Sequence, residues 1–154
     1  MVLFTPTVKA ADVTASAPYM WSSVAIGGGG FTTGIVAHPK EPNLLYARSD
    51  VGGVYRWDDN AKTWISLMGS FGIDQRNYFG VDGIAPDPNN PDVVYIAAGK
   101  DINSGTSDVL KSTDRGATWK KTNLNKRFSG NGKLRFTGEL IAVDPANSHI
   151  VYVG

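Results

Sequence analysis

The sequence predicts an all-β fold made of β-propeller blades, and three observations carry this prediction. The 154 residues include eighteen glycines and eight prolines, a composition typical of short strands joined by tight turns. A pattern of apolar strand, x-Pro turn and second apolar strand recurs at intervals of about fifty residues. A hairpin-turn motif ending in tryptophan accompanies the pattern. Four short strands in each such period are typical of a propeller blade, so the chain holds about two and a half four-stranded blades.

The chain begins with a segment that carries no strand pattern. Residues 1–19 are rich in Ala, Thr and Pro, and we expect a disordered lead-in there. A basic n-region and a long apolar stretch are absent, so the segment does not read as an intact signal peptide. Residues 20–154 are predicted to form part of a propeller, in units of about 20–68, 69–122 and 123–154, the last incomplete.

Four consecutive glycines follow at 27–30. A phosphate-binding loop would continue with Lys-Ser/Thr and open a helix, and neither feature follows Phe31. We therefore expect a flexible or close-packed turn.

Residues 43–64 predict a β-hairpin. An apolar run at 44–47 and a second run at 54–57, Val-Tyr-Arg-Trp, flank Gly52 and Gly53, and an acidic turn follows at 58–60. This pattern places Asp50 at the mouth of the hairpin, where the glycines would let another group approach the backbone. Asp50 is the best candidate for chemistry, and the structural alternative is that it caps the turn, as Asp-x-Gly sites commonly do.

The x-Pro turns and the tyrosines that follow them recur with a regular spacing. In each unit a tyrosine follows the proline of an x-Pro turn by seven residues, and successive tyrosines are 49 and 57 residues apart. We expect a structural role for His38, which occupies the turn position that aspartate fills in the other two units. The turns are His38-Pro39, Asp87-Pro88 and Asp144-Pro145, and the tyrosines are Tyr46, Tyr95 and Tyr152.

Residues 112–119 read Ser-Thr-Asp-Arg-Gly-Ala-Thr-Trp and match the Asp-box pattern Ser-x-Asp-x-Gly-x-Thr-Trp. A degenerate copy at 57–64 keeps Asp59, Thr63 and Trp64. We expect Asp114 to accept backbone N–H groups across a hairpin turn, Gly116 to supply a positive φ, and Trp119 to pack against the next sheet. The motif marks a fold, so Asp114 is assigned a structural role.

Charge and composition exclude several classes of function. The net charge is +1 with both signs interspersed, which argues against nucleic acid and anionic membranes as partners. No apolar run approaches the roughly 18 residues of a membrane span. With no cysteine and two separated histidines, the sequence predicts neither a metal site nor a cofactor.

Taken together, these motifs give the chain a family resemblance. It resembles the N-terminal part of glycoside hydrolase family 74, the xyloglucan-active β-glucanases built from two seven-bladed propellers. The most specific segment is Ala-Arg-Ser-Asp-Val-Gly-Gly-Val-Tyr-Arg at 47–56, in which Ser49 stands where the family usually has threonine. The resemblance follows family order over roughly residues 20–154 and also includes segments 26–31, 34–36, 79–85, 112–119 and 138–145.

The resemblance implies a secreted glycosidase that cleaves β-1,4-glucan backbones, xyloglucan above all, by inversion. It makes Asp50 the general base, and a neighbouring cation such as Arg48 would favour the ionised, exposed carboxylate that a base needs. Inversion uses two carboxyl groups roughly 6.5–9.5 Å apart. The family's general acid is an aspartate of the second propeller, so we expect these 154 residues alone to be inactive.

The resemblance also directs attention to sugar-binding residues. Tyr55 and Tyr78 are aromatic candidates for stacking on pyranose rings, with core packing as the alternative. Asp82 is a candidate for bonding sugar hydroxyls, with capping as the alternative. Arg135 is the fourth candidate, in a loop where bulky residues 134 and 136 replace the family's usual glycines and could reshape the substrate groove.

The expected partners are the polysaccharide and whatever covers the open blade edges, either a C-terminal propeller or a second copy of the chain. A second hypothesis is a carbohydrate-binding or scaffolding propeller segment without catalysis. A sialidase shares the Asp-box but needs an arginine cluster around a carboxylate and a Tyr/Glu nucleophile pair, and no such constellation is apparent.

Overall fold

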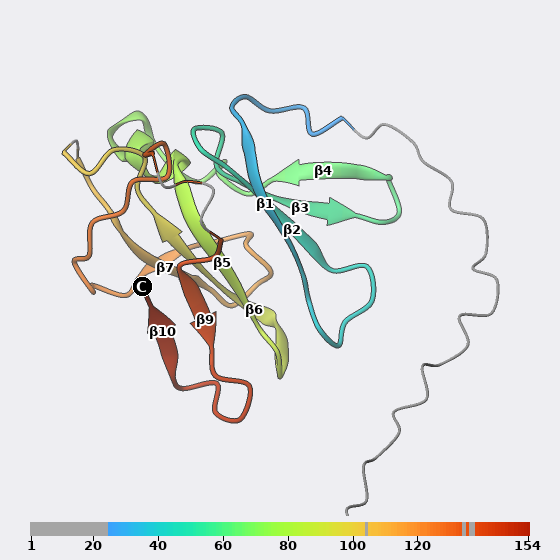
Figure 1. The fold of residues 1–154 in the computed structure, drawn as a ribbon. Coiled ribbons are helices and arrows are strands. Elements are labelled where there is room, and N and C mark those ends of the chain that lie inside the picture. The colour runs from blue at the N-terminus through green and yellow to red at the C-terminus, as the bar shows by residue number, and fades with distance from the viewer. Residues whose placement is uncertain (1–24, 104, 134, 136–137) are drawn as a thin grey trace, which may run out of the picture.

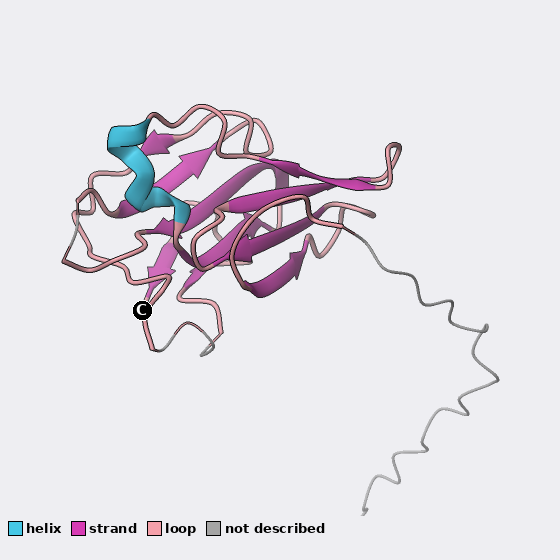
Figure 2. Ribbon diagram, turned by 90° about the horizontal axis from the view of Figure 1, so that it is seen from above, coloured by secondary structure: helices cyan, strands magenta, loops and turns pink. Residues whose placement is uncertain are grey.

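The structure, a computed structural model, describes residues 25–103, 105–133, 135 and 138–154, and this part of the chain is all-β apart from one short helix. Its strands form three antiparallel sheets of four, four and two strands (Figure 1). A 3₁₀ helix, η1 (Ile73–Phe79), joins the first two sheets (Figure 2). The first sheet contains β1 (Thr32–Ala37), β2 (Leu45–Ser49), β3 (Val54–Asp58) and β4 (Thr63–Ser66). The second contains β5 (Val81–Asp87), β6 (Asn90–Ala98), β7 (Asp108–Ser112) and β8 (Lys120–Lys121), and the third contains β9 (Ile141–Val143) and β10 (Val151–Val153).

Both four-stranded sheets are meanders in which each strand pairs with the one that follows it in sequence. In the first sheet, for example, Ala47 of β2 is opposite Ile35 of β1 and Tyr55 of β3. This strand order is that of a propeller blade, and the predicted all-β fold of four-stranded units is confirmed. The predicted lead-in at 1–19 lies outside the described residues.

The hydrophobic core lies between the sheets. One cluster packs the first sheet and η1 on the second sheet and includes Tyr46, Val54, Tyr78 and Ile96. Another packs the second sheet on the third and includes Tyr95, Val109, Phe128 and Ile141. The second sheet is therefore covered on both faces, and its strand β6 is buried at six consecutive positions as such packing requires.

The Asp-box forms the predicted hairpin turn between β7 and β8. The Asp114 carboxylate accepts the Thr118 N–H at 2.8 Å and the Thr118 hydroxyl at 2.6 Å, and Gly116 has a φ of +87°. The indole of Trp119 donates to the Leu67 carbonyl at 3.0 Å, at the end of the first sheet. Trp119 thus packs against the preceding sheet, which corrects the expectation that it contacts the next one.

His38 has the structural role that was predicted for it. Its Nδ1 accepts the backbone N–H groups of Lys40 and Glu41, at 3.1 and 2.8 Å, and its Nε2 lies 2.9 Å from the Asp87 carbonyl oxygen. Because Nδ1 accepts, the proton of the neutral ring is on Nε2, which donates to Asp87. The ring therefore closes the x-Pro turn and links the first sheet to the second.

Candidate active site

The predicted site lies at the turn between β2 and β3, at the same end of the molecule as η1 and the segment that precedes β9 (Figure 1). The turn is closed by a bond from the Ser49 N–H to the Gly53 carbonyl at 2.9 Å. Gly53 has a φ of +88°, which favours glycine at this position. The Gly53 N–H donates to the Phe79 carbonyl at 2.7 Å, so the turn is fixed to the end of η1.

Asp50 lies in this turn, but its side chain is buried. The residue is 7% exposed, and its Oδ1 accepts the Phe31 N–H at 2.7 Å. The Asp50 N–H in turn donates to the Phe31 carbonyl at 3.1 Å. The expectation of an exposed Asp50 is therefore wrong, because a backbone segment from upstream lies over the turn and takes one carboxylate oxygen.

The covering segment is the run of glycines at 27–30. The Ser49 hydroxyl donates to the Gly29 carbonyl at 3.1 Å, and a Cβ on Gly30 would lie 2.7 Å from Oδ1 of Asp50. A Cβ on Gly52 would collide with the Gly29 carbonyl oxygen. The predicted close approach to the Gly52–Gly53 backbone therefore occurs, and the approaching group is the chain's own glycine segment.

Arg48 does not serve the Asp50 carboxylate, contrary to expectation. Its guanidinium is buried and donates to Oε1 of Glu139 at 2.9 Å and to the Gly138 carbonyl at 2.9 Å. It also donates to the Thr33 hydroxyl at 2.7 Å and the Val81 carbonyl at 3.2 Å. The side chains of Arg48 and Asp50 start from the same strand end but face different partners.

Arg135 is the cation that the fold brings to Asp50. Its Nε lies 3.9 Å from Oδ2 of Asp50, and its Nη1 lies 3.4 Å from the Asn131 carbonyl oxygen. Oδ1 of Asp50 therefore serves the backbone of Phe31, while Oδ2 is directed to a cation. The structure thus unites Asp50 with one of the four predicted substrate-binding residues.

The other three predicted substrate-binding residues are buried in structural roles. The Tyr55 hydroxyl donates to the Gly52 carbonyl at 3.0 Å, and burial raises the pKa of Tyr55. The Tyr78 ring, 1% exposed, packs edge-on against Phe71 with centroids 5.5 Å apart. Neither tyrosine presents an open face, which corrects the expectation that they flank an exposed sugar site.

Asp82 caps a loop rather than facing solvent. Its Oδ2 accepts the Ser129 N–H at 2.6 Å, and desolvation by burial raises the pKa of the Asp82 carboxyl. This arrangement matches the capping alternative, and the Ser129 N–H that it binds opens the segment that carries Arg135.

Glu139 is a site residue that sequence reasoning missed. Its Oε1 accepts Arg48 and its Oε2 accepts the Ile84 N–H at 2.6 Å. One signal was available, because Glu139 is one of two glutamates in the chain and follows Gly138 in a segment that resembles the family. Its contacts join positions 55 and 91 residues apart, and no local pattern predicts such pairs.

The described residues contain no group of three or more His, Asp or Glu side chains that could hold a metal ion. None of the helical structure in the described ranges is long and apolar enough to cross a membrane. Around Asp50 itself, the described residues supply one facing cation, Arg135, and the backbone of Phe31.

Comparison with known proteins shows strong similarity to xyloglucanases. The chain is 47% identical to Xyloglucanase Xgh74A of Acetivibrio thermocellus over 99% of its residues. It is 40% identical to an oligoxyloglucan-reducing end-specific xyloglucanase of Emericella nidulans over 94%. The chain spans 18% of the length of each of these curated relatives. No family model matches it.

Solved structures agree with these sequence relatives. The GH74 xyloglucanase from Xanthomonas campestris superposes with a TM-score of 0.79 at 45% identity, over 89% of this chain and 20% of that one. The Niastella koreensis GH74 enzyme gives 0.76 at 42% identity, over 85% and 19%. The three sheets thus correspond to a portion of a much larger propeller protein.

Proposed function

Because this chain is homologous to part of the glycoside hydrolase family 74 xyloglucanases, we propose that it is a segment of a glycosidase that cleaves β-1,4-glucan backbones, with xyloglucan as substrate. The 47% identity over 99% of the chain is the observation that carries this proposal. We further propose that the enzyme acts outside the cell and inverts the anomeric centre, with Asp50 as the general base.

The geometry at Asp50 defines what the base role requires. Oδ1 is committed to the Phe31 N–H at 2.7 Å, so Oδ2 is the oxygen that would accept a proton from the attacking water. The guanidinium of Arg135 lies 3.9 Å from Oδ2, and its positive charge stabilises the negative charge of the ionised carboxylate. Inversion also needs a second carboxyl group roughly 6.5–9.5 Å away, with a water between the two. We propose that this group, the general acid, lies on a second propeller outside the chain.

The same geometry favours one alternative. An aspartate that is 7% exposed and bonded to backbone could serve the turn alone. The segment would then bind or scaffold polysaccharide without performing catalysis.

Xyloglucan hydrolysis by the natural protein that carries this chain separates the two functions. We expect Asp50→Asn to lower kcat by about 10²–10⁴-fold, the usual contribution of a general base, with polysaccharide binding retained. The matched control is Asp92→Asn, an exposed carboxylate on the second sheet that pairs with Arg115 at 2.8 Å. Undiminished turnover in Asp50→Asn would exclude Asp50 as the base. The 154-residue chain alone is expected to release no reducing sugar.

A further inference from the structure

The glycine segment at 27–30 determines how the Asp50 carboxylate is held. Phe31 follows this segment, donates its N–H to Oδ1 of Asp50 at 2.7 Å and accepts the Asp50 N–H at 3.1 Å. Both bonds use the backbone of Phe31, so the direction of the carboxylate depends on where that backbone lies. Four glycines have no side chains with which to pack, and glycine loses more conformational entropy on folding than other residues. The segment therefore needs a polar contact that fixes it over Asp50.

The hydroxyl of Ser49 supplies such a contact. Ser49 is 2% exposed, and its hydroxyl donates to the Gly29 carbonyl at 3.1 Å. The same oxygen accepts the Gly52 N–H at 3.0 Å. A serine hydroxyl has one proton to donate and two lone pairs that accept, so the proton is directed to the segment and a lone pair to the turn. One oxygen atom therefore joins the turn that carries Asp50 to the segment that presents the Phe31 N–H.

The glycine segment lies directly against both oxygens. A Cβ on Gly30 would collide with Oγ of Ser49 and would lie 2.7 Å from Oδ1 of Asp50. Gly30 also has a φ of +92°, which favours glycine at this position. Because Oγ of Ser49 and Oδ1 of Asp50 lie against the same residue, a displacement of the segment at Ser49 would also displace the surroundings of the carboxylate.

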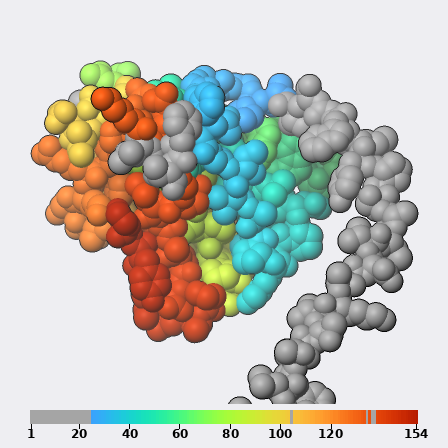
Figure 3. Space-filling view, in the orientation of Figure 1, coloured from blue at the N-terminus to red at the C-terminus, as the bar shows by residue number. Residues whose placement is uncertain are grey.

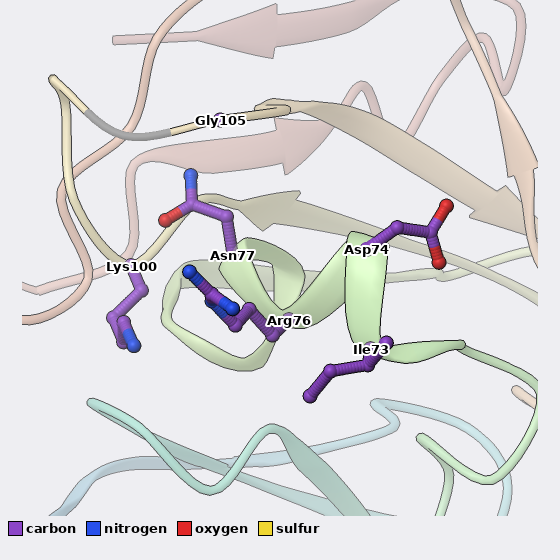
Figure 4. A pocket seen from close by; sticks show the side chains of 6 residues that line it. All are labelled: Ile73, Asp74, Arg76, Asn77, Lys100 and Gly105. Atoms are coloured by element: carbon purple, nitrogen blue, oxygen red, sulfur yellow. The ribbon is translucent and has the colours of Figure 1, made fainter.

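The opposite side of the turn is supported by η1. The Gly53 N–H bonds the Phe79 carbonyl at 2.7 Å, at the end of the helix. The helix is itself attached to the loop that follows β6, because the Asn77 side chain points towards the segment of Gly105 in Figure 4 and donates to the Thr106 carbonyl at 2.9 Å. The turn thus has a fixed support on its η1 side, and the hydroxyl joins it to the glycine segment on the other.

We propose that Ser49 is a positioning residue for the general base. Its hydroxyl fixes the glycine segment on the turn, the segment places the Phe31 N–H, and this N–H orients Asp50 so that Oδ2 is directed to the attacking water. A general base must lie within about 2.6–3.2 Å of the atom whose proton it takes, and the residues around a site hold such geometry to within about 0.5 Å. This role depends on the proposed function, because it requires Asp50 to be the base.

Xyloglucan hydrolysis by the natural protein that carries this chain tests the role of Ser49 with three variants. Ser49→Ala removes the hydroxyl and should lower kcat by about 10–10²-fold, because small misplacements of a reacting group have effects of that order. KM should stay within about twofold, since the buried hydroxyl acts on the base and not on binding. Ser49→Thr retains the hydroxyl and should keep kcat near that of the wild type. Ser49→Cys has a similar shape but a weaker donor, and should give an intermediate kcat.

Ser112→Ala is the matched control. Ser112 is 1% exposed, and its hydroxyl donates to Oδ1 of Asp114 at 2.7 Å and accepts the Gly116 N–H at 2.8 Å, so it also closes a hairpin turn. This variant should lose stability in urea unfolding as Ser49→Ala does, but it should keep full kcat because the Asp-box turn carries no catalytic group. A loss of kcat in Ser112→Ala equal to that in Ser49→Ala would overturn the proposal, since general destabilisation would explain both.

The double variant Ser49→Ala with Asp50→Asn separates positioning from a structural role. If Ser49 acts through Asp50, loss of the hydroxyl should change the residual kcat of Asp50→Asn by less than about twofold, because residues that act as a unit are not additive. An equal loss in both backgrounds, undiminished kcat in Ser49→Ala, or a kcat of Ser49→Thr as low as that of Ser49→Ala would overturn the proposal. Any of these results alongside loss of hydrolysis in Asp50→Asn would leave the proposed function standing. Full hydrolysis by Asp50→Asn would instead exclude Asp50 as the base, and the positioning role of Ser49 with it.

Discussion

At the scale of single residues, two buried aspartates show how backbone bonding decides what a carboxylate does. Asp50 gives one oxygen to the Phe31 N–H and directs the other to Arg135. Asp82 gives Oδ2 to the Ser129 N–H, and its burial raises the pKa of the carboxyl. Asp50 therefore has one oxygen that faces a side-chain cation. The hydrogen bond that Asp82 accepts comes from a backbone N–H.

Asp82 yields a prediction about stability. Asp82→Ala leaves the Ser129 N–H without its acceptor and should cost about 1–3 kcal/mol, whereas Asp82→Asn keeps an acceptor oxygen and should cost less. Because the pKa of Asp82 is raised in the folded state, its stabilising contribution is greatest below the unfolded pKa and declines as the pH rises through the folded pKa. The difference between wild type and Asp82→Asn in urea unfolding should therefore shift in favour of the variant between pH 3 and pH 7. A difference that does not change with pH would contradict this assignment.

At the scale of elements, the Asp-box hairpin is held by its own side chains. Hydrogen bonds from the hydroxyls of Thr118 and Ser112, followed by the Thr118 N–H, lower the pKa of Asp114 to about 2. All of these partners lie within four residues of Asp114, so a local sequence pattern was enough to predict the turn.

The lowered pKa of Asp114 predicts an acid-sensitive hairpin. A depressed pKa stabilises the fold above the unfolded value of about 3.9, and the contribution is lost as the pH falls towards 2. Asp114 is exposed to solvent, so screening should keep the effect below about 1 kcal/mol. Asp114→Asn should flatten the fall in the urea midpoint between pH 4 and pH 2. Asp92→Asn serves as the control, and an unchanged slope in Asp114→Asn would count against the assignment.

The separation in sequence between contacting residues also explains which features the sequence could predict. The hairpins, the x-Pro turns and the Asp-box turn depend on residues within about ten positions of one another, and these predictions are confirmed. The sheet that Trp119 contacts, 52 residues away in sequence, was predicted wrongly. The cover over Asp50 comes from residues about twenty positions upstream, and no pattern in the hairpin itself reports it. The partners of Arg48 depend on how whole sheets pack, which the periodicity of the sequence does not encode.

At the scale of the whole molecule, Arg48 connects the first two sheets with the segment that leads into the third. Its guanidinium bonds Thr33 in the first sheet, Val81 in the second, and Gly138 and Glu139 immediately before the third. Figure 3 shows the blue segment that contains β1 beside the orange-red segment that precedes β9. The apolar clusters hold neighbouring sheets in contact, whereas this side chain also ties the first sheet to the segment that leads into the third.

Removal of Arg48 should therefore cost far more than removal of a surface cation. Arg48→Met abolishes four hydrogen bonds and leaves the Glu139 carboxylate, 28% exposed, without its cation, which should cost about 3–5 kcal/mol as for other broken buried pairs. Glu139→Gln keeps an acceptor for Arg48 and should cost less. The control is Lys62→Met, which breaks an exposed pair with Asp59 and should cost far less, because solvent screens that pair.

Urea unfolding measures these differences, and a double variant identifies their origin. Arg48→Met combined with Glu139→Gln removes both charges, so it should be less destabilised than the sum of the single variants, since the two residues share one bond at 2.9 Å. Strict additivity would show that the Arg48–Glu139 pair does not contribute to the cost of Arg48→Met, which would then come from the other three hydrogen bonds of Arg48 and from packing. A loss in Arg48→Met no larger than that in Lys62→Met would show that the apolar clusters suffice to hold the three sheets, and that Arg48 is not required to join the first sheet to the segment that leads into the third.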